Sequence, residues 1–468
     1  MSRTINIIDP QQFTSTHSCE FRLNKSNVAY LTNGAYLCLG AHATNGTPGE
    51  VLYNRRAGIA SLIKNIRLLN GGDVLAQLDN AGTWMAWKGL NQDNANAISR
   101  KQMSFNTAGI EFDGLRTSTD ERVKYQQLIV DSESGVTVGT LGTSEATASV
   151  GSMELKSFLK ELEVLTVLPT AIFSNLRLEI RWNTDVNQIC KKMESIAGVV
   201  SSVEAVRPLL VIESIEDPMV IAQMIQSMGQ LNFTCIESDR FVIPDISGAN
   251  TRTTHNFTIR GFNDKIINRV LVVNSPTGGA DGEGGIRARS SDGDGTVTTR
   301  ALDSGPFNSI AQNRYTLQCR VNGQALFTGR GLGYDDSIGG TGGAGYNHRL
   351  AVLGDTWGDV SICQAGNTVG LVVGGYGSTT DASGHFDYEV ALAKQLQSLT
   401  FGSDYTGFKI MNRVSHLEFD ISRTALAPNV NLPFMNSNDF NQSIHQIIFA
   451  EVPKVLQISG MNYRVSYL

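Results

Sequence analysis

The chain has 468 residues, of which 41% are hydrophobic and 18% charged, and its formal net charge is −6. A chain of this length exceeds what one hydrophobic core usually serves, so we expect two domains. The first thirty residues offer only Arg3, Arg22 and Lys25 as basic side chains, which argues against direct nucleic-acid binding. No stretch approaches eighteen consecutive apolar residues, so no transmembrane segment is expected. The 47 glycines against 11 prolines favour short strands joined by tight turns, and hence an all-β fold.

The cysteines are scattered and include no C-x-x-C pair, and the N-terminus does not resemble a secretory signal. We interpret them as reduced core residues of a protein that folds in a cytosol. Cys319 supports this interpretation, because alternation places it on the apolar face of a predicted strand. The six cysteines are Cys19, Cys38, Cys190, Cys235, Cys319 and Cys363.

In chain order, residues 1–18 read as an N-terminal extension rich in Thr, Ser and Gln. Short apolar stretches broken by Asn and Gly follow, and they predict strands as far as about residue 182. These predicted strands are Ala35–Gly40, Ala60–Leu69, Val74–Leu78, Leu128–Val130 and Leu176–Arg181.

One helix is predicted within this first half, because apolar residues recur at helical spacing before Pro169. These residues are Leu155, Phe158, Leu159, Leu162 and Leu165. The corresponding place in the second half has Leu392, Leu396 and Leu399.

A connecting helix is predicted between the halves. Asp217 can cap it, Pro218 suits its first turn, Met219–Met228 is largely apolar, and Gly229 ends it.

The second half begins near Phe241, with strands predicted around Asn256–Arg260 and Ile267–Val273. Two glycine-rich insertions follow, Asn274–Gly305 and Gly329–Gly345. Such composition cannot bury enough apolar surface to form a core, so we expect exposed loops on one rim.

The two halves carry the same pattern. A strictly alternating strand runs into an Asn-Gly turn at Arg314–Gly323, and a looser copy lies at Asn65–Gly71. About a hundred residues after each turn comes a short strand of perfect alternation, Leu176–Arg181 in one half and His416–Ile421 in the other. Loop insertions absorb the small difference in spacing, since longer loops cost little closure entropy. We therefore predict two related β domains in tandem.

Motifs that would carry chemistry are incomplete. The glycine string Gly340–Gly345 lacks the buried strand and following helix that a dinucleotide site requires. Asp292–Gly295 resembles the start of a calcium loop, but Ala301 stands where a bidentate Glu is needed. Arg287 and Arg289 lie among acidic residues that cancel their field. All of these are interpreted as turns or solvated loops.

The two Ser-x-x-Lys strings, Ser61–Lys64 and Ser157–Lys160, lie on a predicted strand and a predicted helix without companion motifs. The histidines form no metal-binding spacing, and His416 lies on the polar side of its strand. We therefore expect no catalytic, cofactor-binding or metal-binding residues, no cofactor and no enzyme activity. The histidines are His17, His42, His255, His348, His385, His416 and His445.

The duplicated order resembles that of viral double jelly-roll major capsid proteins, the tailless phage and adenovirus lineage that includes polintons, virophages and yaravirus. Leu155–Pro169 followed by Leu176–Trp182 resembles the helix, "LP" and penultimate strand of the first barrel. Tyr388–Phe401 followed by His416–Ile421 looks like its counterpart, and Ile59–Gln77 is similar to the first-barrel hairpins. The resemblance covers about residues 20–468. It departs from the family where a long tower loop is expected, because residues 79–127 are modest and the glycine-rich insertions enlarge the second barrel instead.

The resemblance implies two tandem eight-stranded jelly-roll β-sandwiches with a few short helices in connecting segments. The expected division is an extension at 1–18, a first jelly roll with its helical connector at 19–238, and a second jelly roll at 239–468. The implied function is a major capsid protein in the virion shell, synthesised and assembled inside the host cell.

Its implied partners are further copies of itself, in homotrimers of pseudo-hexameric outline that tile an icosahedral shell, together with penton and minor capsid proteins. The alternative is a tandem β-sandwich spike or carbohydrate-binding protein, for which Trp84 and Trp87 are the nearest approach to a clustered aromatic pair.

Overall fold

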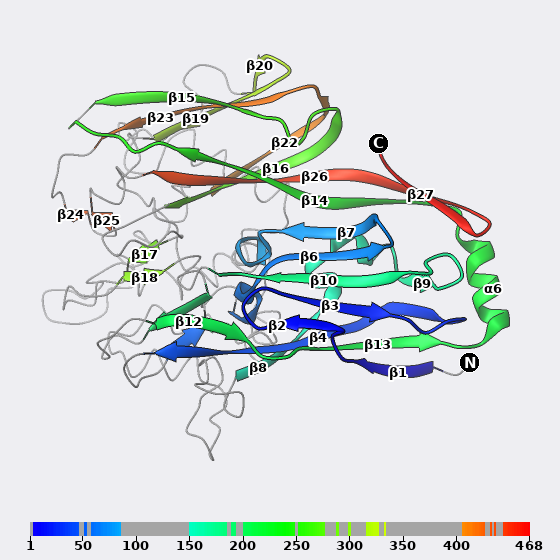
Figure 1. Cartoon of the computed structure of the whole chain (residues 1–468). Coiled ribbons are helices and arrows are strands. Elements are labelled where there is room, and N and C mark those ends of the chain that lie inside the picture. The colour runs from blue at the N-terminus through cyan, green and yellow to red at the C-terminus, as the bar shows by residue number, and fades with distance from the viewer. Residues whose placement is uncertain are drawn as a thin grey trace, which may run out of the picture.

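The computed structural model shows two β-sandwiches lying next to one another, joined by one helix (Figure 1). It describes residues 3–45, 51–53, 58–85, 149–184, 189–192, 200–248, 251–276, 287–289, 298–300, 315–326, 332–333, 405–425, 431–432, 435–436 and 443–468.

The first sandwich consists of two antiparallel sheets. One sheet contains β1 (Arg3–Ile8), β13 (Leu209–Ile215), β4 (Ala29–Asn45) and β8 (Ser149–Glu154). The other contains β3 (Ser18–Leu23), β10 (Leu176–Trp182), β6 (Ile63–Asn70) and β7 (Asp73–Asp79). Shorter strands extend these sheets or pair beside them: β2 (Gln12–Thr14), β9 (Val167–Pro169), β12 (Val200–Ala205), and the pair β5 (Val51–Tyr53) and β11 (Cys190–Lys192).

The second sandwich repeats this arrangement. One sheet contains β14 (Gln230–Ile243), β26 (Ile444–Ser459), β16 (Lys265–Pro276) and β22 (Tyr405–Val414). The other contains β15 (Arg252–Ile259), β23 (Leu417–Thr424), β19 (Tyr315–Val321) and β20 (Gln324–Ala325). The remaining short strands are β17 (Arg287–Arg289), β18 (Thr298–Arg300), β21 (Leu332–Gly333), β24 (Asn431–Leu432), β25 (Met435–Asn436) and β27 (Asn462–Tyr467).

The two sandwiches have the same strand connectivity. If the main strands of each half are numbered 1 to 8 along the chain, both halves have one sheet in the order 1-8-3-6 and another in the order 2-7-4-5. In the first half these strands are β1, β3, β4, β6, β7, β8, β10 and β13, and in the second half they are β14, β15, β16, β19, β20, β22, β23 and β26. Two four-stranded sheets connected in this way form a jelly roll. The predicted all-β fold of two tandem jelly rolls is therefore confirmed.

The duplicated turns and strands occupy equivalent places. Asn322 and Gly323 have φ angles of 52° and 81°, the left-handed pair that a tight hairpin needs, and Gly71 of the other copy has φ 62°. The strand before each turn pairs with the alternating strand that follows later: β6 with β10 and β19 with β23. Inward residues of β10 and β23, such as Leu178 and Phe419, are fully buried because alternation sends every second side chain into the core.

The helix predicted before Pro169 is broken. Its five apolar residues are all buried, as the spacing requires, but Leu155 and Phe158 lie in one α-helical turn, α4 (Leu155–Phe158), and Leu162 lies in a separate 3-10 turn, η3 (Lys160–Glu163), with Leu165 beyond it. Leu159 between them is extended, with φ −99° and ψ 94°. A further difference is η1 (Gly58–Leu62), a 3-10 turn that occupies the start of the strand predicted from Ala60.

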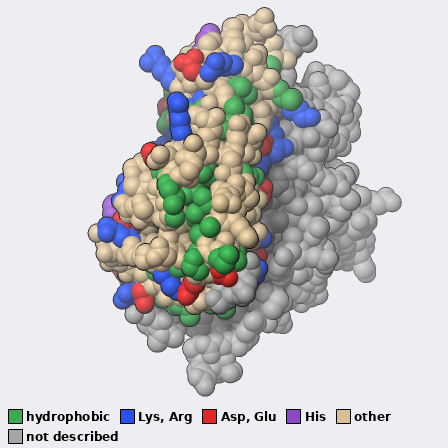
Figure 2. Space-filling view, turned by 90° about the vertical axis from the view of Figure 1, so that its right-hand side faces the viewer, with side chains coloured by type: hydrophobic (Ala, Val, Ile, Leu, Met, Phe, Trp, Pro, Cys, Tyr) green, Lys and Arg blue, Asp and Glu red, His purple; other side chains and the backbone are tan. Residues whose placement is uncertain are grey.

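The predicted connecting helix is confirmed as α6 (Pro218–Ser227), with the Asp217 side chain accepting hydrogen bonds from the amides of Met219 and Val220. Its buried side packs on Ile215 and Ala29 of the first sandwich. Figure 2 views the molecule from the side on which α6 lies and shows hydrophobic side chains gathered at the middle of that face.

The chain division expected from the sequence differs from the strand bounds. Residues Arg3–Ile8 of the expected extension form strand 1 of the first sandwich, paired with β13. The expected boundary at 238 falls inside β14, whose pairing with β26 starts at Gln230.

Several expectations fall on residues outside the described ranges. These are the strand at Leu128–Val130, the residues Leu392, Leu396 and Leu399, the strings Asp292–Gly295 and Gly340–Gly345, and most of both glycine-rich insertions.

Candidate functional site

The interface between the two sandwiches is built on a shared hydrophobic core. The main core cluster belongs to the first half, but it also includes buried apolar residues of the second half. The rings of Trp84 and Phe449 approach to 5.3 Å between centroids, and those of Phe173 and Tyr463 to 5.1 Å. The second-half members of the cluster are Phe233, Ile236, Leu271, Ile447, Phe449 and Leu456.

Strand alternation explains how one sheet serves two cores. On β26, Ile448, Ala450 and Val452 face the core of the second sandwich, whereas Ile447 and Phe449 face the first half. The first half meets this outer face of the sheet with its edge strand β7 and the neighbouring η3, both of which contact β14. Figure 1 shows β7 lying next to β14. The first sandwich therefore packs with strand 5 (β7) and the η3 turn against the outer face of the sheet that contains strands 1, 8 and 3 of the second.

Polar side chains fix the register of the two halves. The Asn70 amide donates to the Tyr463 hydroxyl at 2.9 Å, and that hydroxyl donates to Asp73 at 2.8 Å. Further along, Asn80 donates to the Ser238 hydroxyl at 3.0 Å. Directional contacts of this kind prevent the apolar surfaces from sliding over one another.

A buried charge network completes the interface. Glu451, with 7% of its side chain exposed, accepts from Lys160 of the first half at 2.7 Å and also pairs with Arg269 of the second half. Glu237, equally buried, accepts from Lys265 at 2.6 Å and lies 3.5 Å from Lys454. Each buried carboxylate thus has charged partners, which offsets the cost of removing it from water.

Tyr467 covers the Glu237 end of the network. Its hydroxyl donates to Glu237 at 2.6 Å. Two ammonium groups lie over its ring, that of Lys265 at 4.6 Å and that of Lys454 at 4.8 Å from the ring centroid. Hydrogen bonding and cation–π attraction therefore act on the same group of side chains.

The environment shifts the acid–base properties of these groups. Burial lowers the pKa of Lys160 to about 8, with Arg269 as the next contribution. Burial raises the pKa of Glu161 to about 7, and this carboxylate accepts from the Gln77 amide at 3.2 Å. Burial also opposes ionisation of Glu237, but the hydrogen bonds from Lys265 and Tyr467 outweigh it and lower its pKa.

The adjacent thiol is not activated. Burial raises the pKa of Cys235 to about 12, so it stays protonated at neutral pH. The Lys160–Glu451 pair of the network joins the two sandwiches, and its thiol Cys235 is not an activated nucleophile. Its chemistry is that of a structural clamp.

The Ser-x-x-Lys residues are not brought together as a nucleophile and base. Ser61 is buried, with its hydroxyl 2.6 Å from the Gly58 carbonyl, while Lys64 is exposed on β6. Lys160 instead pairs with Glu451 across the interface. His416 lies immediately before β23, beside Ser415 and Glu418.

The described ranges contain no cluster of three metal-ligating side chains, and none of their helices has the length and hydrophobicity that a bilayer crossing requires.

The charge network was missed at the sequence level, because its members are up to about three hundred residues apart. One signal was present: Glu451 and Lys454 interrupt an otherwise apolar stretch, Ile447–Leu456. Charged residues inside an apolar strand require buried partners.

With this geometry, the chain can be compared with known proteins. No protein-family model and no curated protein sequence matches it. Its architecture defines a double jelly-roll protein, and solved structures share it over most of their length.

VP54 of PBCV-1, as fitted into a cryo-EM reconstruction of the virophage Sputnik, matches with a TM-score of 0.53 and 10% identity over 100% of this chain and 97% of the other. The mavirus major capsid protein matches with a TM-score of 0.51 and 8% identity over 99% and 90% of the two chains. A chain of the Sputnik virophage structure has a TM-score of 0.50 and 11% identity over 100% and 88%. The chain therefore shares its fold with viral major capsid proteins, as the sequence resemblance implied.

Proposed function

We propose that this chain is a major capsid protein whose copies build the shell of a virion. The observation that carries the proposal is the internal duplication: two jelly rolls of identical connectivity held in one fixed relation by a common core. The similarity of fold to the mavirus major capsid protein supports it.

The duplication suits a hexagonal building block. Three copies supply six equivalent sandwiches, and a ring closed by head-to-tail contacts is finite, so it does not grow into a filament. Its outline has near-sixfold symmetry, which allows it to tile a lattice. Contacts within such a trimer are expected to bury more than about 2,000 Å², while contacts between trimers can be smaller because many act together.

The clamp between the sandwiches matters to this role. A lattice accumulates angular error from every unit, so each chain must present its two sandwiches at one angle. The shared core and the Lys160–Glu451 ion pair between the sandwiches restrict that angle. We further propose a virion location after assembly in the host cell, with penton and minor capsid proteins as additional partners.

The alternative of a carbohydrate-binding or spike protein would need exposed aromatic rings. Trp84 and Trp182 are only 5% and 4% exposed, and Trp84 packs on Phe449. Trp87, the other member of the pair noted in the sequence, lies outside the described residues. No described tryptophan is thus available to stack on a sugar.

The proposal is tested on the purified full-length chain. Size-exclusion chromatography with light scattering is expected to give a trimer, and electron microscopy particles of hexagonal outline. A monomer at all concentrations, above all one that binds glycans on an array, would contradict the proposal.

A further inference from the structure

Strand β27 lies at an open edge of the second sandwich. It follows β26 through a tight turn at Gly460 and Met461, and Asn462–Tyr467 then pairs with the last part of β26. Figure 1 shows β27 at the same end of the molecule as α6. Among the residues that the structure describes, β26 is the only strand that pairs with β27, so the other long edge of β27 has no neighbour.

The backbone groups on that edge are unpaired. Successive residues of an antiparallel strand direct their N–H and C=O groups alternately toward and away from the neighbouring strand. The Leu468 amide donates to the Pro453 carbonyl of β26 at 3.3 Å, so the even-numbered residues of β27 face β26 and the odd-numbered residues face away. The amides and carbonyls of these odd-numbered residues have no hydrogen-bond partner in the described part of the chain. The odd-numbered residues are Tyr463, Val465 and Tyr467.

β27 lacks the features that usually block strand addition at a sheet edge. Natural edge strands often contain proline, carry lysine or are bent by a bulge. Asn462–Tyr467 contains no proline and no lysine, and its pairing with β26 has no register shift. Apolar side chains at both of its ends are also exposed, since Met461 is 63% and Leu468 is 45% exposed. The edge is therefore open to pairing with a further strand.

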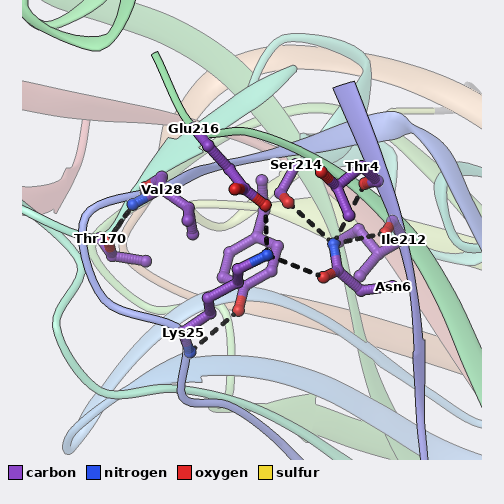
Figure 3. Close-up of polar contacts among 9 residues, drawn as sticks. Thr4, Asn6, Lys25, Val28, Thr170, Ile212, Ser214 and Glu216 are labelled. Carbon is purple, nitrogen blue, oxygen red and sulfur yellow. Dashed lines mark hydrogen bonds and ion pairs between the residues drawn. The ribbon is translucent and has the colours of Figure 1, made fainter. Parts of the chain in front are cut away.

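The edge strand of the first sandwich near this end, β1, has a different environment. Figure 3 shows Lys25 and Glu216 turned toward the side chain of Asn6 on β1. The Asn6 amide donates to the Thr4 carbonyl of its own strand at 3.2 Å, and Lys25 donates to Asn6 at 3.5 Å and pairs with Glu216. Charged side chains beside an edge strand disfavour the addition of another strand. β27 has no such group of polar and charged neighbours along its free edge.

We infer that the free edge of β27 is a docking site for an extended segment of another polypeptide, which adds a strand to the sheet. Only a polypeptide strand presents alternating donors and acceptors at the spacing of the unpaired groups on β27. In the proposed shell this segment belongs to a second virion protein, and that step alone rests on the proposed function.

The side chains of β27 define the chemistry of the segment. Val465 packs against the main core cluster, so a partner residue opposite it lies on the apolar face of the added strand. Arg464 is exposed on the other face, and no carboxylate pairs with it among the described residues. An acidic residue opposite Arg464 therefore suits the site. A second copy of β27 contains no acidic residue, so a segment of different sequence fits better.

The first test measures binding of a synthetic peptide to the full-length chain. The probe is fluorescently labelled acetyl-Thr-Val-Thr-Val-Glu-Val-Thr-amide, whose antiparallel pairing places its Glu opposite Arg464. Val465→Pro removes an outward N–H and leaves the bonds to β26 intact, so it is expected to weaken peptide binding by about 10-fold or more. The matched control, Val465→Ala, shortens the same side chain but keeps the N–H, and its affinity should stay within about 2-fold of the wild type.

Fluorescence anisotropy reports binding, and circular dichroism confirms that each variant is folded. Peptide binding by the wild type and Val465→Ala, with loss in Val465→Pro, supports the inference. No saturable binding to the wild type up to about 1 mM peptide, or equal binding by the two variants, overturns it. Either result leaves the capsid proposal standing, because that proposal depends on the oligomer. A monomeric wild type that binds the peptide contradicts the capsid proposal alone.

A second measurement needs no variant that must fold. Hydrogen exchange of the wild type is followed by mass spectrometry at single-amide resolution, with and without the peptide. The outward amides of Val465 and Tyr467 are expected to exchange at least about 10-fold more slowly with saturating peptide, whereas those of Arg464 and Ser466, which face β26, should change little. Outward amides that are already protected in the purified chain would show that a second copy fills the edge and would overturn the inference. An unchanged exchange rate on adding the peptide would overturn it as well.

Discussion

Glu161 is an acidic residue in a fully buried environment. It is fully buried beside Lys454 and Glu237, and burial holds its pKa near 7, above its usual value of 4.5. A raised acid pKa means that the folded state binds the proton more tightly than the unfolded state. The resulting stability is fully present below about pH 4.5 and is lost as the pH rises through 7.

Glu161→Gln removes this titration while keeping an acceptor for the Gln77 amide. Between about pH 5 and pH 8 the wild type should lose about 2 to 3 kcal/mol more unfolding free energy than the variant does. Urea unfolding at the two pH values measures the difference. The control is Glu179→Gln, in a half-buried pair with Arg177, where the wild-type pH dependence should persist. The same pH dependence in Glu161→Gln and wild type would contradict the raised pKa.

At the scale of elements, the duplicated hairpin turns depend on backbone conformation. Gly323 has φ +81°, and a Cβ placed on it would have no atom within 4 Å, so an added methyl group meets strain in the backbone alone. Gly323→Ala should lower the unfolding free energy by about 1 kcal/mol. Gly72→Ala is the control, because Gly72 has equal space and no positive φ, and it should show no loss. Chemical denaturation measures the loss of unfolding free energy in each variant. Equal losses in the two variants would mean that the φ angle is not the cause.

Elements whose signal is local were predictable from the sequence. Alternation in Leu176–Arg181 and His416–Ile421 identified strands that the structure places in the middle of equivalent sheets. Asp217 and Pro218 identified the start of α6 for the same reason, since a cap and a first-turn proline act within one turn.

Elements decided by distant contacts were not predictable. The spacing of Leu155 to Leu165 matches a helix, but these residues pack into a core that favours two separate turns. Strand β1 looks like a polar extension because its partner, β13, lies about two hundred residues away. The Lys160–Glu451 pair likewise depends on how the two sandwiches meet.

At the scale of the whole molecule, the common core should make the two sandwiches unfold together. Phe449 contacts Trp84 across the interface, so neither half can lose its packing without exposing apolar surface of the other. Calorimetry of the full-length chain should show one transition with a ratio of calorimetric to van't Hoff enthalpy of about 1. Phe449→Ala should lower the stability of that single transition by about 3 kcal/mol or more. Two resolved transitions in the wild type would show that the halves are independent.

The short connector between the sandwiches has a consequence for assembly kinetics. Asp217–Gly229 keeps the second sandwich within reach of the first, so their encounter takes place at a high effective concentration and needs no diffusion of separate molecules. In the proposed ring, half of the contacts are made in this way before any two chains meet. Ring formation from three chains then depends on roughly the third power of protein concentration. Ring formation from six separate sandwiches would depend on roughly the sixth power.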